Sequence, residues 1–306
     1  MFFMLSNFNE FHLMVAGYRF CFTCATEPYT LALEQLYEHF LVEAGKSSDL
    51  NLRVHQGIPD FLDHNMAVFS ASYEYGLGKA MQYDWNIQVH DNQTFICCHL
   101  PEHSQQAFWA CRINPGNTWD VYVSEVRTIL GKVCLDALPY PAGPLLMYYF
   151  FTMNHALMLH ASGIYDPVCR QGFIFSGVSG TGKTTISGIW TNAGAEMIND
   201  DRLVLKNHDG ITTMYNNPLY MKDFPRSTRV NAVFLLRQAK ENYMVPVKGA
   251  MALSRLMAFC IQHHHDKGLI ENMTGALFQV IKQVPVYELG FLPDENIVRF
   301  VRDRIG

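Results

Sequence analysis

The hydrophobic pattern changes twice along the chain. Residues 12–26 are largely apolar and predict a strand. Residues 30–44 predict a helix, because their apolar side chains recur at helical spacing, namely Leu31, Leu33, Leu36, Phe40 and Leu41. From 66 to 126 the pattern changes to short apolar runs separated by turn residues, which predicts an antiparallel sheet. Residues 1–140 are therefore expected to form a smaller α+β domain.

A second region begins after the proline-bounded segment 139–144, the best candidate for a domain joint. Residues 145–153 predict a buried helix, followed by strands at 157–164 and 172–176 and by a helix that starts at 184. Later apolar runs at 232–236 and 284–289 suit strands, and 253–264 and 296–304 suit covering helices. Residues 141–306 are therefore expected to form one α/β domain.

A complete phosphate-binding loop lies between the second strand and the helix of this region. It reads Gly177-Val178-Ser179-Gly180-Thr181-Gly182-Lys183-Thr184, which matches G-x-x-x-x-G-K-[ST] in the strand–turn–helix setting that the motif requires. Backbone N–H groups of such a loop and the N-terminus of its helix bind phosphate. Lys183 would reach the β- and γ-phosphates, and the Thr184 hydroxyl would ligate Mg²⁺. The candidate nucleotide-binding residues are Gly177, Ser179, Gly180, Thr181, Gly182, Lys183, Thr184 and, more weakly, Thr185.

Two adjacent carboxylates, Asp200 and Asp201, follow residues 195–199, which predict a second strand of a parallel sheet. Neighbouring side chains on an extended segment point to opposite sides, so the two carboxylates are expected to have different roles. One role is metal binding, since carboxylate oxygens suit Mg²⁺. The other is general base catalysis on a hydroxyl acceptor. A solvated turn is the alternative to both roles.

One histidine, His160, stands in the apolar run 157–164 upstream of the loop. A hairpin with 172–176 would return His160 to the neighbourhood of the phosphates. A histidine in an apolar strand is also typical of a hydrogen-bonded core residue, so both interpretations remain open.

These segments together resemble a known family. The order His160-Ala161-Ser162, the phosphate loop, and Asp200-Asp201-Arg202-Leu203-Val204 is similar to the catalytic domain of HPr kinase/phosphorylase. The loop is also similar to that of ATP-dependent phosphoenolpyruvate carboxykinase, which shares a P-loop superfamily with the kinase. The resemblance covers roughly residues 155–210. It implies a P-loop kinase-like core in which helices flank a mixed sheet.

The resemblance also implies roles for individual residues. Lys183 and the loop amides would bind ATP, and Thr184 with Asp201 would hold the metal. Asp200 would handle the proton, with His160 beside it to orient or polarise the reacting group. In the carboxykinases the matching histidine and second aspartate look after a metal, so His160 as a ligand is the alternative.

The sequence departs from the kinase family downstream of the carboxylates. HPr kinases carry an acidic-Ile-Arg-Gly stretch that docks the protein substrate, and residues 216–226 do not match it. The resemblance therefore does not extend to HPr as the substrate. Lys222, Arg226 and Arg229 in and after this region are candidates to supply positive charge to the phosphoryl group or the acceptor. A solvated basic segment is the alternative.

Composition and charge limit the classes of partner and the compartment that are expected for this chain. The net charge of −5 gives no electrostatic footprint for nucleic acid, and no apolar stretch is long enough for a membrane span. Residues 1–5 are apolar but brief and lack a basic start, so no signal peptide is expected and the cytoplasm is the expected compartment. Free thiols are expected there for the eight cysteines. A zinc site of Cys21 and Cys24 with Cys97 and Cys98, or a metal at residues 263–265, is the alternative.

The sequence thus predicts an ATP- and Mg²⁺-dependent kinase that transfers the γ-phosphate to a hydroxyl. By resemblance, the favoured acceptor is a serine of a protein or peptide. One alternative is a carboxykinase-like phosphotransferase acting on a small acid, which would require arginines that converge on the nucleotide. The other is a regulatory module that binds ATP without turnover. The role of the N-terminal region and a homo-oligomeric state stay open.

Overall fold

The computed structural model describes residues 4–45, 47–62, 67–71, 84–100, 106–129, 131–218, 223–260 and 266–305. Contacts divide the chain into two compact units. Unit 1 comprises Met1–Tyr149 and Pro218–Phe224, and unit 2 comprises Phe150–Asn217 and Pro225–Gly306. The boundary at 140/141 that the sequence suggests for independent domains stays a prediction.

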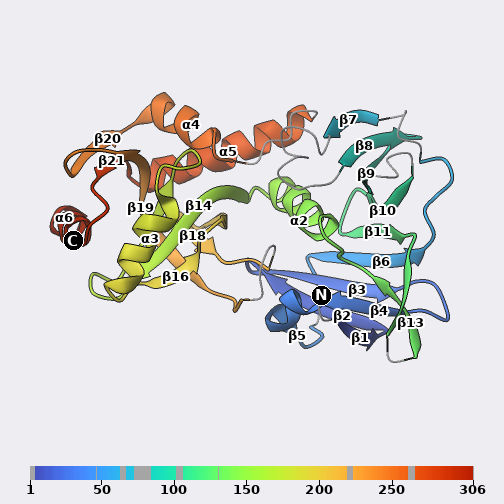
Figure 1. Cartoon of the computed structure of the whole chain (residues 1–306). Coiled ribbons are helices and arrows are strands. Elements are labelled where there is room, and N and C mark those ends of the chain that lie inside the picture. The colour runs from blue at the N-terminus through green and yellow to red at the C-terminus, as the bar shows by residue number, and fades with distance from the viewer. Residues whose placement is uncertain are drawn as a thin grey trace. The chain divides into compact units, whose positions relative to one another are not determined.

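Unit 1 is built mainly of β-strands (Figure 1). Its strands are β1 (Met4–Phe8), β2 (Glu10–Val15), β3 (Tyr18–Cys24), β4 (Thr30–Glu34), β5 (Leu41–Val42), β6 (Leu50–Gln56), β7 (Ala67–Ala71), β8 (Asp84–His90), β9 (Gln93–His99), β10 (Ala107–Ile113), β11 (Thr118–Val123), β12 (Val126–Ile129) and β13 (Lys132–Asp136). A four-stranded sheet has the order β1-β4-β13-β12, and a nine-stranded sheet has the order β5-β2-β3-β6-β11-β10-β9-β8-β7. From β11 to β7 all pairings of the larger sheet are antiparallel, which confirms the prediction for most of residues 66–126.

Two predictions for unit 1 are wrong. Residues 12–26 form a hairpin of β2 and β3 rather than one strand, because Ala16 and Gly17 adopt positive φ angles of 51° and 73° that turn the chain. Residues 30–44 form β4, the 3₁₀-helix η1 (Gln35–Phe40) and β5 rather than a helix. Leu31, Ala32 and Leu33 are fully buried in a strand paired on both edges, and such a continuous apolar run cannot be told from a helix by periodicity.

Unit 2 contains an eight-stranded mixed sheet. Its strands are β14 (Leu157–Asp166), β15 (Gln171–Ser176), β16 (Glu196–Asn199), β17 (Arg202–His208), β18 (Ile211–Tyr215), β19 (Ser227–Gln238), β20 (Tyr243–Val247) and β21 (Val286–Phe291). The order is β15-β14-β17-β18-β19-β21-β20, with β16 paired to β14 and with an additional pairing of β15 to β19. The strand that enters the phosphate loop, β15, therefore lies between β14, to which it is antiparallel, and β19, to which it is parallel.

Helices cover both faces of this sheet (Figure 1). They are α3 (Lys183–Asn192), α4 (Gly249–Met257), α5 (Lys267–Gln283) and α6 (Asn296–Ile305), while α2 (Ala142–Met153) spans the boundary between the units. Alternation along the strands separates two cores, since Phe173 and Phe175 pack with α3 and α6 whereas Ile174 packs with α4 and α5. A mixed sheet with flanking helices around a phosphate loop confirms the predicted fold class.

The remaining sequence predictions are refined by the structure. The buried helix at 145–153 is part of α2, and the strands predicted at 232–236 and 284–289 lie in or overlap β19 and β21. The strand before the two carboxylates, β16, runs antiparallel to β14, so the parallel pairing expected there is wrong. Helix α4 ends at Met257, before residues 261–265, which lie outside the described residues along with the three histidines at 263–265. All eight cysteines are free thiols. Among the described helices, none has the length and apolar character that crossing a membrane requires.

Candidate functional site

The phosphate loop takes its shape from glycines at positions that other residues would strain. Gly180 and Gly182 have φ angles of +81° and +99°, and Gly182 is the N-cap of α3. A Cβ on Gly182 would lie 2.8 Å from the Phe291 ring, and a Cβ on Gly177 would lie 2.5 Å from Thr181 Oγ1. The Thr181 hydroxyl and amide both donate to the Val178 carbonyl, at 2.8 and 3.2 Å. The loop is therefore held as a tight turn whose helix begins at Lys183.

The Lys183 side chain is buried inside this turn. Its Nζ donates to the Gly177 carbonyl at 2.9 Å. Burial lowers the pKa of Lys183, and the negative charge of Asp201 opposes that shift. Thr184 and Thr185, in the first turn of α3, are exposed. An ammonium group enclosed by the loop, beside exposed hydroxyls at a helix N-terminus, fits a bound polyphosphate.

Asp200 is anchored to the helix that follows the loop. The Ser187 hydroxyl, which is fully buried, lies 2.9 Å from Asp200 Oδ1 and 3.3 Å from the Thr184 carbonyl oxygen. Ser187 follows Lys183 by one helical turn and also lies 2.9 Å from its carbonyl oxygen. Asp200 is thereby tied to the turn of α3 that carries Thr184. Ser187 was not predicted from the sequence, although its spacing of one helical turn from Lys183 was a usable signal.

Asp201 pairs with a different group. Its Oδ1 lies 3.0 Å from His160 Nδ1 and 3.0 Å from Arg202 Nη1, and the Arg202 guanidinium also contacts the His160 ring. Burial raises the pKa of the Asp201 carboxyl, but the hydrogen bond with His160 and the charges of Arg202, His160 and Lys183 outweigh it, so the pKa is lowered. A half-exposed carboxylate is thus kept ionised beside Lys183. His160 is a partner of this carboxylate rather than an isolated core histidine.

Three asparagines fix the segment that carries both carboxylates. Asn199 Oδ1 accepts hydrogen bonds from the backbone N–H of Asp201 at 2.9 Å and of Arg202 at 2.8 Å. Its Nδ2 donates to Asn216 Oδ1 at 2.6 Å, and Asn217 Nδ2 donates to the Arg202 carbonyl at 2.6 Å. Asn216 and Asn217 are buried. Both asparagines belong to residues 216–226, which depart from the kinase signature. Part of this stretch therefore holds the segment that carries the two carboxylates.

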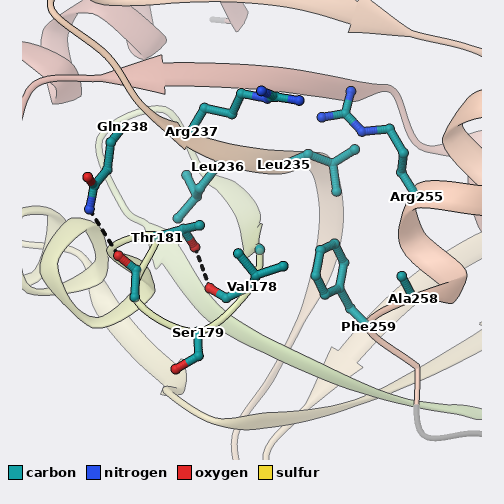
Figure 2. Close-up of a pocket in the computed structure, with 12 residues that line it drawn as sticks. Val178, Ser179, Thr181, Leu235, Leu236, Arg237, Gln238, Arg255, Ala258 and Phe259 are labelled. Carbon is teal, nitrogen blue, oxygen red and sulfur yellow. Dashed lines mark hydrogen bonds between the residues drawn. The ribbon is translucent and has the colours of Figure 1, made fainter.

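A pocket of about 610 Å³ opens beside the loop (Figure 2). It is lined by Gly177, Val178, Ser179, Gly180, Thr181, Leu235, Leu236, Arg237, Gln238, Arg255, Ala258 and Phe259. Gln238 Nε2 donates to the Gly180 carbonyl at 3.0 Å, which ties the end of β19 to the loop. The Phe259 carbonyl accepts a hydrogen bond from the backbone N–H of His160 at 2.9 Å. One wall of the pocket is therefore joined to β14, the strand that carries this histidine.

The structure thus brings His160, Lys183, Asp200 and Asp201 to one end of the sheet in unit 2, around the loop. Of the three basic residues singled out downstream, Lys222 lies outside the described residues, Arg226 directly precedes β19, and Arg229 is the third residue of β19. The loop-facing end of β19 instead carries Arg237, which the sequence analysis missed together with Arg255.

Comparisons with known proteins agree with the location of this site. Residues 145–224, which are 80 of the 306 residues, match the family model described as phosphoenolpyruvate carboxykinase. This match confirms the resemblance of the loop region to the P-loop superfamily that includes this carboxykinase. A search of curated proteins finds no match.

Among solved structures, the chain is similar to the Hpr(Ser) kinase/phosphatase from Coxiella burnetii, at 13% sequence identity and a TM-score of 0.30. The similarity covers 48% of this chain and 97% of that chain. The fold assignment accordingly rests on the topology of unit 2 described above.

Proposed function

We propose that the chain is an ATP- and Mg²⁺-dependent phosphotransferase that moves the γ-phosphate to a hydroxyl, with a serine of a protein or peptide as the acceptor. The observation that carries this proposal is the grouping of an enclosed lysine, Lys183, with an ionised carboxylate, Asp201, that pairs with His160. A phosphate-binding turn alone serves nucleotide binding. A carboxylate poised beside it suits proton removal from an acceptor.

The loop and the start of α3 are assigned to the nucleotide. Backbone N–H groups of residues 177–182 and the helix N-terminus bind the phosphates, and the Lys183 ammonium pairs with the β- and γ-phosphate oxygens. The exposed Thr184 hydroxyl and a carboxylate are the hard oxygen ligands that Mg²⁺ prefers. Bound there, Mg²⁺ would neutralise charge that develops on the phosphates.

The two carboxylates are assigned to metal binding and to proton removal. The sequence resemblance predicts Asp200 as the base and Asp201 as the metal ligand. The contacts support the exchanged division better, because Ser187 ties Asp200 to the turn that carries Thr184. Asp201 instead faces His160, Arg202 and Lys183, where the transferred phosphate would lie. We therefore propose Asp200 as the metal ligand and Asp201 as the base.

Asp201 takes the proton of the acceptor hydroxyl, and the acceptor oxygen forms a bond to the γ-phosphorus. The bond from that phosphorus to the bridging oxygen of the β-phosphate breaks, and ADP leaves with this electron pair. Lys183 and Arg202 offset negative charge during the transfer, and His160 orients the Asp201 carboxylate through Nδ1.

The test uses γ-labelled ATP and Mg²⁺ with the purified protein, alone and with lysate from its own organism. Asp201→Asn is expected to abolish label transfer while a fluorescent ATP analogue still binds. Asp200→Asn is expected to raise the Mg²⁺ concentration that half-maximal transfer requires. Asp303→Asn, at an exposed position of α6, is the matched control and should behave as wild type. Label transfer that survives in Asp201→Asn would contradict the proposed base, and ATP binding with no transfer by wild type would favour a regulatory module.

A carboxykinase-like reaction on a small acid is the second candidate, because residues 145–224 match the carboxykinase family model. It predicts nucleotide-dependent turnover of oxaloacetate in the absence of any protein acceptor. Incubation of wild type and Asp201→Asn with oxaloacetate and labelled ATP, followed by separation of small phosphorylated products, distinguishes the two functions.

A further inference from the structure

Two arginines at the pocket share a single carboxylate. Arg237 Nε lies 3.0 Å from Glu288 Oε2, and Arg255 Nη2 lies 2.6 Å from the same oxygen. Figure 2 shows the two guanidinium groups reaching toward each other along one side of the pocket, across from the phosphate loop. Within the described ranges, Glu288 is the only acid paired with either arginine. The trio therefore carries one net positive charge.

The pairing of β19 with β21 brings Arg237 and Glu288 together. Leu235 is the register partner of Glu288, and Arg237 lies two residues further along β19, so its side chain points to the same side of the sheet as that of Leu235. Arg255 comes from α4, and the Tyr243 hydroxyl donates to the other oxygen of Glu288 at 2.9 Å. Burial raises the pKa of Glu288, but the hydrogen bonds from Arg255 and Tyr243 and the arginine charges outweigh it and lower the pKa. Glu288 is a fixed anion that orients both guanidinium groups.

The pocket lies between the phosphate loop and the two arginines. Its lining includes the first five residues of the loop and, within the described residues, none from α3. Lys183 and Thr184 at the helix N-terminus, which are assigned to the β- and γ-phosphates and to Mg²⁺, do not line the pocket. Phe259, another lining residue, accepts the backbone N–H of His160, which pairs with the proposed base. A molecule in this pocket would thus lie between the loop that is assigned to the phosphates and the two arginines.

We propose that this pocket binds the phosphoryl acceptor and that Arg237 and Arg255 bind a carboxylate that the acceptor carries close to its reactive hydroxyl. The inference rests on the proposed phosphotransfer and names the chemical class of its substrate. A planar guanidinium matches a carboxylate through paired hydrogen bonds, and each arginine has five donors of which the contacts to Glu288 use only part. Leu235, Leu236 and Phe259 are apolar residues of the lining that the rest of the acceptor would meet.

The experiment measures kcat/KM with γ-labelled ATP and defined acceptors. The probes are three synthetic peptides with a single serine flanked by aspartates, asparagines or lysines, together with glycerate and glycerol. Wild type should prefer the aspartate peptide over the asparagine peptide, or glycerate over glycerol, by about tenfold. Preference among the peptides indicates an acidic peptide segment, and preference for glycerate indicates a small hydroxy acid. Either preference supports an acidic acceptor.

Single variants assign this preference to the arginines. In Arg237→Gln and Arg255→Gln the preference should fall to about twofold or less, mainly through KM, while a fluorescent ATP analogue binds with unchanged affinity. Arg255→Lys should keep part of the preference, because it retains the charge but loses the planar fork. Arg299→Gln, on the exposed side of α6, is the control and should match wild type. If Arg255→Gln fails to fold, the more exposed Arg237 still tests the site.

Three results would overturn the proposal. Equal transfer to acidic and neutral probes by wild type would leave the phosphotransferase function standing and remove the acidic acceptor. Weakened ATP binding in the arginine variants, with every acceptor affected alike, would assign the arginines to the nucleotide. ATP binding with no transfer to any probe or to lysate proteins would contradict the phosphotransferase function itself, and with it this acceptor site.

Discussion

At the scale of single residues, Ser187 determines where one carboxylate of the site points. Its hydroxyl is fully buried and lies 2.9 Å from Asp200 Oδ1. Ser187→Ala should lower kcat/KM about tenfold and raise the Mg²⁺ concentration for half-maximal transfer, because Asp200 is no longer held beside Thr184. The free energy of unfolding should fall by only about 1 kcal/mol. Titration of transfer with Mg²⁺ and chemical denaturation measure the two effects.

The control for Ser187 is Thr274→Ala on α5. The Thr274 hydroxyl donates to a backbone carbonyl one turn earlier, at 2.7 Å, but contacts no residue of the site. This variant should lose comparable stability and keep the Mg²⁺ dependence of wild type. Equal Mg²⁺ titrations for Ser187→Ala and wild type would show that Ser187 has only a structural role.

His160 determines the pH at which its neighbouring carboxylate gains a proton. The hydrogen bond from His160 favours the ionised form of Asp201 and lowers its pKa, so transfer should fall on the acid side only below the ordinary aspartate range. His160→Ala removes this contribution, so the pKa of Asp201 should rise, while the charges of Arg202 and Lys183 continue to lower it. At any given acidic pH, a larger fraction of molecules then carries a protonated Asp201. The acid limb of kcat/KM should therefore move to higher pH.

The pH profile of kcat/KM for wild type and His160→Ala measures this shift. His155→Ala is a matched control, because His155 lies outside the site in the connection between α2 and β14. An acid limb that stays in place, or moves to lower pH, in His160→Ala would contradict the pairing of His160 with the catalytic base.

At the scale of elements, the loop and α3 offer two glycines in contrasting environments. Gly182 has a φ of +99° and a Cβ position 2.8 Å from Phe291, whereas Gly188 lies within α3 with no neighbour near its Cβ position. Gly182→Ala should lower the free energy of unfolding by about 1 to 3 kcal/mol and abolish ATP binding. Gly188→Ala should retain ATP binding and raise stability by up to about 1 kcal/mol. Thermal melting and a fluorescent ATP analogue measure both, and similar effects of the two substitutions would refute the strained loop.

Features that depend on neighbouring residues could be predicted from the sequence. The β15–loop–α3 unit follows from glycine positions and helix signals within 22 residues, from 171 to 192. The order of His160, the loop and the carboxylates identified the site. The structure of segment 30–44 could not be predicted in this way, because the pairing of β4 with β1 and β13 overrides the helical spacing of its apolar residues. Arg237, Arg255 and Glu288 were also missed, since they meet only through the pairing of β19 with β21 and the return of α4.

At the scale of the whole molecule, the chain crosses between its two compact units more than once. The segment Pro218–Phe224 belongs to unit 1, although it connects β18 and β19 of unit 2. Every residue that we assign to the nucleotide, the base and the acceptor lies in unit 2. The units therefore differ in how directly a bound nucleotide can stabilise them.

This difference predicts where ATP protects the backbone. Binding to the native state stabilises it by about 2.7 kcal/mol at a ligand concentration of 100 times Kd, and the effect is confined to segments that open together with the site. In hydrogen exchange, ATP with Mg²⁺ should slow exchange in β14, β15 and α3, and leave β8, β9 and β10 of unit 1 unchanged. Lys183→Ala should show no protection in either unit. Equal protection of β8–β10 and β14–α3 would mean that the two units open as one, and protection of unit 1 alone would place the nucleotide away from the loop.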